Sequence, residues 1–477
     1  RSTTVTGVQT CALPIFYLVN PNGVIFGQGA KVDVGAGTFA ASTQAIATIN
    51  QAAFVADGKC DLSTAGTTMD VVNLIDPAKG SIKANHVEMA GRNIRFLNTK
   101  SIETTGTTVN LQSNTDATVV AHGNGYVHIG YEAAVSDSYG VVDSSKSPTT
   151  LGWQVNGVLA TEANAYMLVN NGTQLQNMQT KTDGNYMLGK DITLSANFTP
   201  ISTFSGNFDG NFYTIYDLHI PFSSGDAGLF AKIDGGASVS RIENVLFAKG
   251  AMSPEASVRS TGGYAGTVAG QAKNALIQNV GVKAGGDVYG NGSEAMAGGL
   301  VGFADNSTIR SSYNERKVYG GGIVGSAINN THISDVYNKG EVQYGIIGSN
   351  KTGVIVERVY STNAVQDLMW LGWEGYARNN SPQTGNLNGY FYFSDKGQPN
   401  VGNPPSSAQV YTGLTSEYKR YETFVDGVVH SKYTITPWGS AHISEDGGAR
   451  TTWRIRSNGT LPTLTRSEEH TSELQSR

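Results

Sequence analysis

The sequence predicts an all-β protein built as a β-solenoid, in which short strands stack coil upon coil. Glycine supplies 59 of the 477 residues and only 15% of the residues are charged, so turn formers are abundant and helix-forming Lys and Glu are few. Apolar and polar residues alternate over short stretches, which is typical of strands. One sequence pattern also recurs at a step of 23 residues, and a fixed period of this length is typical of a solenoid.

The alternation is clearest in residues 80–130. Apolar residues occupy every second position in four successive stretches: Val87 and Met89, Ile94 and Phe96, Val109 and Leu111, and Val127 and Ile129. Glycine and asparagine separate these stretches, as they do between strands. Because two-residue hairpin loops are rare here, we expect the strands to stack on one another rather than to pair as hairpins.

A repeated pattern between residues 268 and 360 gives the strongest prediction of stacking. Two small apolar residues precede a glycine, and isoleucine and then Val or Tyr follow at similar distances. Three copies begin at Leu300, Ile323 and Ile346, at steps of 23 residues, whereas Val268 precedes Leu300 by 32 residues. We expect a loop insertion in the longer step. One coil buries too little surface to be stable alone, so these residues should line up in one column.

The glycine of each copy has an expected structural role. Gly302, Gly325 and Gly348 occupy the same place in three copies of the pattern. Glycine inside a strand pattern marks a sharp turn of the backbone or a close approach between neighbouring segments. We therefore expect these glycines to shape the coils rather than to bind a ligand.

A tight turn is predicted at Asn20, Pro21, Asn22 and Gly23. Proline fixes φ at the second turn position and glycine stands at the last, which favours a type I turn. Such a turn joins two short strands at a corner. These four residues are also the best functional candidates in the sequence, although a plain corner turn is an equal alternative.

The chain divides into segments of different composition. Both ends resemble peptides that arise when sequencing-adapter DNA is translated, and we expect them to be artefacts. The expected order is artefact (1–15), β-helix (16–135), polar linker (136–164), repeat module with one short helix near its start (165–365), aromatic-rich closing β region (366–465) and artefact (466–477). The closing region is expected to form an irregular β cap, because a bare terminal coil exposes an unpaired strand edge.

Composition excludes several classes of protein. The net charge is −5 and no basic block is present, so nucleic acid is not an expected partner. No apolar run reaches the length of a membrane span. The two cysteines are Cys11, inside the adapter-like segment, and Cys60, so neither a disulfide framework nor a structural zinc site is expected. We predict no metal and no cofactor.

Residues 16–43 resemble the secretion domain of filamentous-haemagglutinin-type exoproteins of two-partner systems. The resemblance lies in LVNPNGVIFGQGAKVDVGAGTFAAST, with its NPNG turn, Gly-rich strand and Ala-Ser-Thr ending, and it weakens towards residue 130. It implies a right-handed parallel β-helix that an outer-membrane β-barrel transporter recognises before the protein is secreted. The turn would then shape the face presented to the transporter, and the signal peptide would be missing from this fragment.

Residues 151–464 resemble proteins with GLUG-motif repeats. The resemblance rests on GGLVG (298–302), GGIVG (321–325) and GIIG (345–348). Such repeats occur in many bacterial surface proteins. They therefore imply a location at the cell surface more strongly than they imply an activity.

Enzyme motifs are weak or absent in the sequence. Neither HExxH nor GxSxG occurs, and GNYMLGK (184–190) resembles a phosphate-binding loop only until Asp191, which stands where Ser or Thr should hold Mg²⁺. Asp183, Asp209 and Asp234 lie near glycines, as turn residues do, and no two of these aspartates are expected to stack on equivalent coils. We therefore predict no catalytic residues and no enzyme.

These observations together predict part of a secreted bacterial surface adhesin, present at the cell surface and monomeric. Its receptor would be a glycan or a protein on a host or bacterial surface. Trp370, Trp373 and Tyr376 are possible glycan contacts, with packing in the cap as the alternative. Two other functions stay open, namely a carbohydrate-active β-helix enzyme (a polysaccharide lyase or hydrolase) and a passive stalk.

Overall fold

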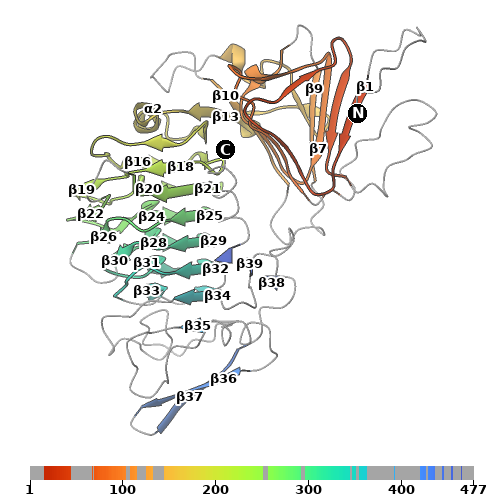
Figure 1. Cartoon of the computed structure of the whole chain (residues 1–477). Helices are drawn as coiled ribbons and strands as arrows, with labels where there is room; N and C mark the ends of the chain where they lie inside the picture. Colours follow the sequence, from red (N-terminus) through yellow and green to blue (C-terminus); the bar gives the residue numbers. More distant parts are fainter. Residues whose placement is uncertain are drawn as a thin grey trace. The chain divides into compact units, whose positions relative to one another are not determined.

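The computed structural model is mostly β-strand, arranged in parallel sheets, and the chain forms two compact units (Figure 1). Unit 1 comprises residues 1–134 and 141–168, and unit 2 comprises residues 135–140 and 169–477. The residues that the structure describes are 15–44, 67, 69–103, 108–114, 125–132, 144–250, 256–291, 296–343, 346–350 and 354–361, with short strands at 391–392, 419–425, 428–435, 443–444, 453–454 and 463–464. Trp370, Trp373, Tyr376 and Cys60 lie outside the described residues.

Unit 1 contains two larger sheets and one strand pair. The first sheet has the order β1 (Ile15–Val19), β4 (Thr38–Ser42), β7 (His86–Gly91), β9 (Thr108–Ser113), β11 (Gln154–Val155) and β12 (Val158–Leu159). The second runs through β2 (Val24–Phe26), β5 (Val71–Asn73), β8 (Ile94–Phe96), β10 (Val127–Tyr131) and β13 (Ala165–Val169), and β3 (Lys31–Asp33) pairs with β6 (Ser81–Lys83). All these pairs are parallel except β11 with β12.

The core of unit 1 forms from the alternating apolar residues. All eight residues of the predicted alternation between Val87 and Ile129 are buried and belong to one hydrophobic cluster. Phe39, Val87 and Val109 lie opposite one another on β4, β7 and β9, so their side chains fall on the same face of the sheet. The strands of this unit therefore stack in register around a shared apolar interior.

Unit 2 contains three main sheets. The largest has the order β14 (Asn185–Leu188), β17 (Asn207–Asp209), β21 (Ser240–Ala248), β25 (Ala275–Val282), β29 (Thr308–Asn314), β32 (His332–Asn338), β34 (Ile355–Ser361) and β35 (Phe391–Tyr392), with β15 (Ile192–Thr193) and β18 (Thr214–Tyr216) beside it. The second is β16 (Ile201–Phe204), β20 (Phe230–Asp234), β24 (Ala269–Lys273), β28 (Val301–Asp305), β31 (Val324–Ile328) and β33 (Ile347–Asn350). The third is β19 (Ile220–Ser223), β22 (Val258–Ser260), β26 (Asp287–Tyr289) and β30 (Lys317–Val318).

Smaller elements complete the described part of unit 2. The helix α2 (Gly172–Asn177) forms where one was expected, and the side chain of Asn171 caps it by accepting a hydrogen bond from the Gln174 backbone at 2.8 Å. The short strand pair β23 (Ala265–Gly266) and β27 (Ala297–Gly298) is parallel. Towards the end of the chain lie the antiparallel pair β36 (Lys419–Val425) and β37 (Val428–Ile435), and the small sheet β38 (Ile443–Ser444), β39 (Trp453–Arg454) and β40 (Thr463–Leu464).

The repeat residues form one column in unit 2, as predicted. The backbone N–H of Leu300 donates to the carbonyl of Ile323 at 3.0 Å, and that of Ile323 donates to Ile346 at 2.9 Å. All three side chains are fully buried. The strands of the second sheet accordingly lie one below another from β16 to β33 (Figure 1).

A row of left-handed residues crosses the largest sheet of unit 2. Asn244, Asn279, Ser311 and Asp335 have φ between 49° and 56° and occupy equivalent places on β21, β25, β29 and β32. The Asn279 side chain donates to the Oδ1 of Asn244 at 2.8 Å, so the asparagines also bond from strand to strand. Asparagine and aspartate tolerate this conformation better than most residues, which explains their recurrence at a bend in each strand.

Candidate functional site

The NPNG turn lies on the surface of unit 1, between β1 and β2. The Gly23 N–H donates to the Asn20 carbonyl at 3.1 Å, which closes the turn, and the Asn22 N–H donates to the Asn20 side chain at 3.1 Å. Gly23 has φ of +108°, a conformation that side chains rarely adopt. Asn20 and Asn22 are exposed, so their side chains are accessible to a partner.

The repeat glycines lie in unit 2 where strands approach closely. A Cβ on Gly302 would lie 2.7 Å from the backbone nitrogen of Ala265. Gly325 and Gly348 each lie against the first glycine of the preceding copy of the motif. A Cβ on Gly298 would lie 2.5 Å from the nitrogen of Gly325, and one on Gly321 would lie 2.4 Å from that of Gly348. These contacts fit a packing role.

An exposed row of side chains crosses the third sheet of unit 2. On β22, β26 and β30 the residues Val258, Val288 and Val318 are buried, and their neighbours along each strand point outwards. On β19 Ile220 is buried, and Phe222, where the register with β22 shifts, is exposed. We call the outward set the tyrosine face. It consists of Phe222, Arg259, Asp287, Tyr289, Lys317, Tyr319 and Glu341.

Aromatic rings of the tyrosine face lie on successive strands. Arg259 is opposite Tyr289, and the paired valines of β26 and β30 bring Tyr289 opposite Tyr319. The two tyrosine rings lie 5.7 Å apart, edge to face. Tyr289 is 38% exposed and Phe222, on the first strand of the sheet, is 74% exposed. Large apolar groups at such exposure indicate a contact surface more than a core.

The charges of the tyrosine face are paired with one another. Arg259 holds both carboxylate oxygens of Asp287 at 2.9 Å, and Lys317 lies 3.1 Å from Glu341. The hydrogen bond to Glu341 is the main cause that raises the pKa of the Lys317 ammonium above its ordinary value. The Lys317 nitrogen also lies 5.0 Å from the centre of the Tyr319 ring.

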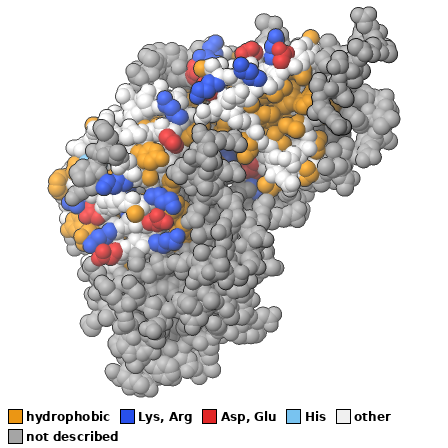
Figure 2. Space-filling model, viewed as in Figure 1, with side chains coloured by type: hydrophobic (Ala, Val, Ile, Leu, Met, Phe, Trp, Pro, Cys, Tyr) orange, Lys and Arg blue, Asp and Glu red, His pale blue; other side chains and the backbone are white. Residues whose placement is uncertain are grey.

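The surface view agrees with this alternation of side-chain types. Figure 2 shows basic, acidic and hydrophobic side chains interspersed on the left of the view, where Figure 1 places β19, β22, β26 and β30. Opposite charges stand next to each other there, and the orange side chains lie between them. The tyrosine face therefore offers rings to a ligand without a large field of either sign.

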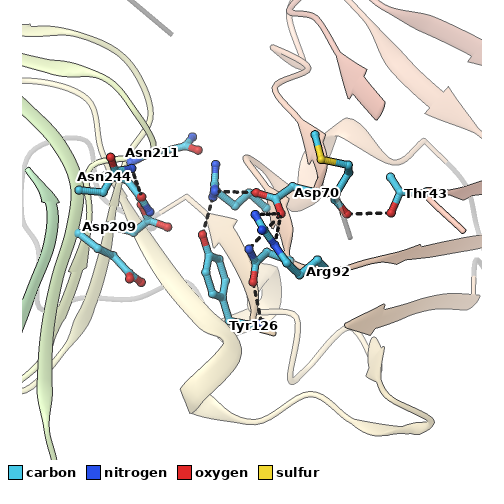
Figure 3. Close-up of polar contacts among 12 residues, drawn as sticks. Thr43, Asp70, Arg92, Tyr126, Asp209, Asn211 and Asn244 are labelled. Carbon is cyan, nitrogen blue, oxygen red and sulfur yellow. Dashed lines mark hydrogen bonds and ion pairs between the residues drawn. The ribbon is translucent and has the colours of Figure 1, made fainter. Parts of the chain in front are cut away.

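A polar cluster in unit 1 centres on Asp70 (Figure 3). Its Oδ1 accepts hydrogen bonds from Arg92 Nε and Nη2 at 3.1 and 2.8 Å and from Asn93 at 3.0 Å, and its Oδ2 accepts one from Arg95 at 3.2 Å. Arg95 also donates to the Tyr126 hydroxyl at 2.9 Å. Both arginines are buried, so one carboxylate balances two guanidinium groups and joins the ends of several strands.

A pair of carboxylates lies on the largest sheet of unit 2. Asp209 on β17 is in register with Glu243 on β21, and both are buried. Asp209 Oδ1 accepts hydrogen bonds from the Asn211 backbone at 2.8 Å and from the Asn244 side chain at 3.0 Å (Figure 3). Arg241 donates to Glu243 at 3.3 Å. Stacked acidic groups are thus present, although Glu243 was not among the residues that the sequence singled out.

No protein-family model, curated protein or solved structure matches the chain significantly. Among the described residues, no helix combines the length and the apolar character that a membrane span requires.

The tyrosine face was not predicted from the sequence, although the sequence contains a signal for it. DVYG (287–290) and KVYG (317–320) share a charged residue, a buried valine, a tyrosine and a glycine. The second motif follows the first at a longer interval than the period of the repeat pattern, so the period does not reveal that the two motifs are related. Tyrosines in such a motif would have been predicted to face outwards, because the valine between the charge and the ring faces inwards.

Proposed function

We propose that the chain is part of a secreted bacterial surface adhesin, built as a right-handed parallel β-helix and exported by two-partner secretion. The observation that carries this proposal is the tyrosine face, an exposed row of aromatic and ion-paired side chains on stacked parallel strands. Its function is presentation and binding rather than catalysis. A passive stalk does not need exposed aromatic rings, because exposed apolar groups on a surface that binds nothing promote aggregation.

The pairing of the strands supports the β-solenoid. Val301, Val324 and Ile347 are partners on three successive strands, and they follow one another in sequence at the constant step of the repeat pattern. Between such partners the chain also passes through the largest sheet of the unit, so each step contributes a strand to more than one sheet. A chain that returns to the same sheets at a constant step builds a rod whose length grows with the number of coils.

Surface binding by the purified chain tests the adhesin. We expect it to bind intact bacterial or animal cells, or immobilised glycans from their surfaces, in a saturable way. A urea-unfolded sample of the same chain is the control for non-specific adsorption. Absence of saturable binding to every cell type and glycan would reject adhesion and favour the stalk.

Export of the full-length protein tests the secretion role of the NPNG turn. Asn22→Ala removes an exposed side chain but keeps the backbone N–H that bonds to Asn20, so the turn should still form. We expect this variant to accumulate inside the cell while its expression stays unchanged. Gly23→Val should give the same result with added backbone strain, because φ there is +108°.

A nearby glycine provides the control for the export test. Gly29 lies in an exposed turn with ordinary φ and open space around it, so Gly29→Ala should be exported normally. Equal amounts of the Asn22→Ala and wild-type proteins in the medium would reject the role of the turn in export.

A carbohydrate-active enzyme is the second candidate, and the carboxylate pair favours it. Asp209 and Glu243 are in register, and Arg310 lies further along the same row of the sheet, beyond Gln278. Polysaccharide hydrolases use a pair of carboxylates that flank the bond to be cleaved. Release of reducing ends or unsaturated products from polygalacturonate, abolished by Asp209→Asn and Glu243→Gln, would establish the enzyme in place of the adhesin.

A further inference from the structure

We propose that the tyrosine face binds an extended, uncharged glycan, which lies across the strands of β19, β22, β26 and β30. This inference rests on the proposed function as an adhesin and names the class of its receptor. Three features of the tyrosine face carry it: exposed rings, charges that are already paired, and a strip only two side chains wide.

The rings provide the apolar surface that a sugar needs. A pyranose presents C–H groups on its faces and hydroxyls around its rim, so it stacks on an aromatic ring while the rim stays hydrated. Tyr289, Tyr319 and Phe222 are exposed or partly exposed and form the aromatic part of the face. Tyrosine adds a hydroxyl that hydrogen-bonds to the rim of a sugar, as polar groups do in binding sites that are otherwise apolar.

The paired charges favour an uncharged glycan over an acidic one. The Nε and Nη2 groups of Arg259 both donate to Asp287, which satisfies the guanidinium in its preferred forked geometry. Lys317 is likewise held by Glu341. A carboxylate or sulfate on a ligand would have to displace one of these partners and would meet its negative charge. A neutral chain can instead accept hydrogen bonds from groups that stay paired.

The layout of the row indicates a chain-like ligand running along the stack. The rings occur on different strands, and paired strands lie about 4.8 Å apart. Arg259, Tyr289 and Tyr319 follow one another across three strands, one residue on each. A protein partner requires a broad patch of several hundred Å². A strip two side chains wide, such as Asp287 and Tyr289 on either side of the buried Val288, instead suits a linear polymer, whose successive sugars meet successive strands.

Affinity electrophoresis of the full chain in gels containing defined polysaccharides tests the inference. The neutral probes are hydroxyethylcellulose, laminarin, dextran and galactomannan, and the acidic probes are polygalacturonate, hyaluronate and heparin. We expect retardation by at least one neutral polymer and by none of the acidic ones. Binding should change less than about twofold between low and high salt, because screening weakens only charge attraction.

Substitutions in the row identify the surface that binds. Tyr289→Ala and Tyr319→Ala should each weaken binding about five- to tenfold, which is the loss of one aromatic contact. Tyr289→Phe keeps the ring and should weaken binding less than Tyr289→Ala does, by about two- to threefold for the lost hydroxyl. Val239→Ala, at a residue 57% exposed outside this sheet, is the matched control and should leave binding unchanged. Unchanged circular dichroism and melting of each variant would exclude unfolding as the cause.

The possible outcomes separate this inference from the adhesin proposal. Binding to cells or to acidic polymers without binding to neutral ones would overturn the uncharged glycan and leave the adhesin standing. Neutral-glycan binding that survives both tyrosine substitutions would place the site elsewhere and overturn the inference as well. Failure to bind any cell, glycan or protein would overturn both proposals.

Discussion

In both units many paired strands are separated by a similar short interval in the sequence, but longer intervals are distributed differently in the two units. The interval in sequence from Val71 to its partner Ile94 in unit 1 equals the interval from Val301 to Val324 in unit 2. In the first sheet of unit 1, the short steps from β1 to β4 and from β7 to β9 alternate with longer steps from β4 to β7 and from β9 to β11. In unit 2 two short steps follow one another from β28 to β33. Equal steps in succession make a period visible in sequence, and alternating insertions hide it.

The two units also satisfy their buried polar groups in different ways. Unit 1 gathers charge around Asp70, where a single carboxylate holds two buried arginines. Unit 2 also joins neutral amides from strand to strand, as in the Asn244–Asn279 and Asn314–Asn338 pairs at 2.8 Å, beside its buried carboxylates Asp209 and Glu243. Identical amides on paired strands can bond to each other whereas identical charges repel, so amides suit a position that recurs from strand to strand.

The largest change in stability is expected at the Asp70 cluster of unit 1. Asp70→Ala should lower the free energy of unfolding of unit 1 by about 3–5 kcal/mol, because Arg92 and Arg95 stay buried without their shared carboxylate. Amide hydrogen exchange in β5, β8 and β10, measured over a denaturant series, reports the change in this unit.

An exposed aspartate in the same unit provides the control for Asp70. Asp33 forms an ion pair with Lys83 at 3.5 Å, with side chains 63% and 52% exposed, so Asp33→Ala should cost less than about 1 kcal/mol. Equal losses for the two substitutions would show that the Asp70 cluster is no more important than a surface pair.

Unit 2 also contains a fully buried guanidinium, and its removal should stabilise the protein. Arg316 is fully buried, and none of its three guanidinium nitrogens has a hydrogen-bond partner among the described residues. Burial lowers the pKa of this guanidinium to about 10, while Asp217 and Asp287 act in the opposite direction. Arg316→Met should raise the free energy of unfolding by about 1–3 kcal/mol, the cost of an unsatisfied buried group.

The pH dependence of this gain follows from the direction of the pKa shift. When burial lowers the pKa of a cation in the folded protein, the cation destabilises the fold by the full amount at every pH below that lowered pKa. The penalty then decreases as the pH rises from the folded-state pKa towards the ordinary one. The gain from Arg316→Met should therefore stay constant between about pH 6 and 9, while Arg316→Lys, which keeps the buried cation, should give none. A loss of stability in Arg316→Met would show that the guanidinium has hydrogen-bond partners when the protein is in solution.

Sequence reasoning predicted the parts of the fold that repetition and alternation encode. The column of Leu300, Ile323 and Ile346 and the buried alternation around Val87 and Met89 followed from the repeat period and from the two-residue period of a strand. The Asp70 cluster could not be predicted, although its partners lie about one short step along the chain, because the longer steps of unit 1 hide that period and no motif joins the residues. The tyrosine face could have been predicted, because its motif occurs twice in the sequence. The interval between the two copies is longer than the repeat period, which obscures the repetition.

The smallest predicted change in stability concerns the row of left-handed residues in unit 2. It tests whether backbone conformation or hydrogen bonding favours asparagine there. Asn279 has φ of 55° and donates to Asn244. Alanine there loses the bond and must adopt a left-handed conformation, so Asn279→Ala should cost about 1–2 kcal/mol. Glycine also loses the bond but adopts this conformation freely, so Asn279→Gly should be about 1 kcal/mol more stable than the alanine variant.

Unit 1 supplies the matched asparagine for this comparison. Asn110 lies within β9 on ordinary strand backbone, so glycine there should be worse than alanine, the reverse of the order at Asn279. Amide exchange in β25 and in β9 measures the two sites separately. If alanine and glycine were equally costly at Asn279, the bond to Asn244 would account for the whole effect. The recurrence of Asn, Ser and Asp along the row would then need another explanation, because serine at position 311 has no amide to continue the ladder.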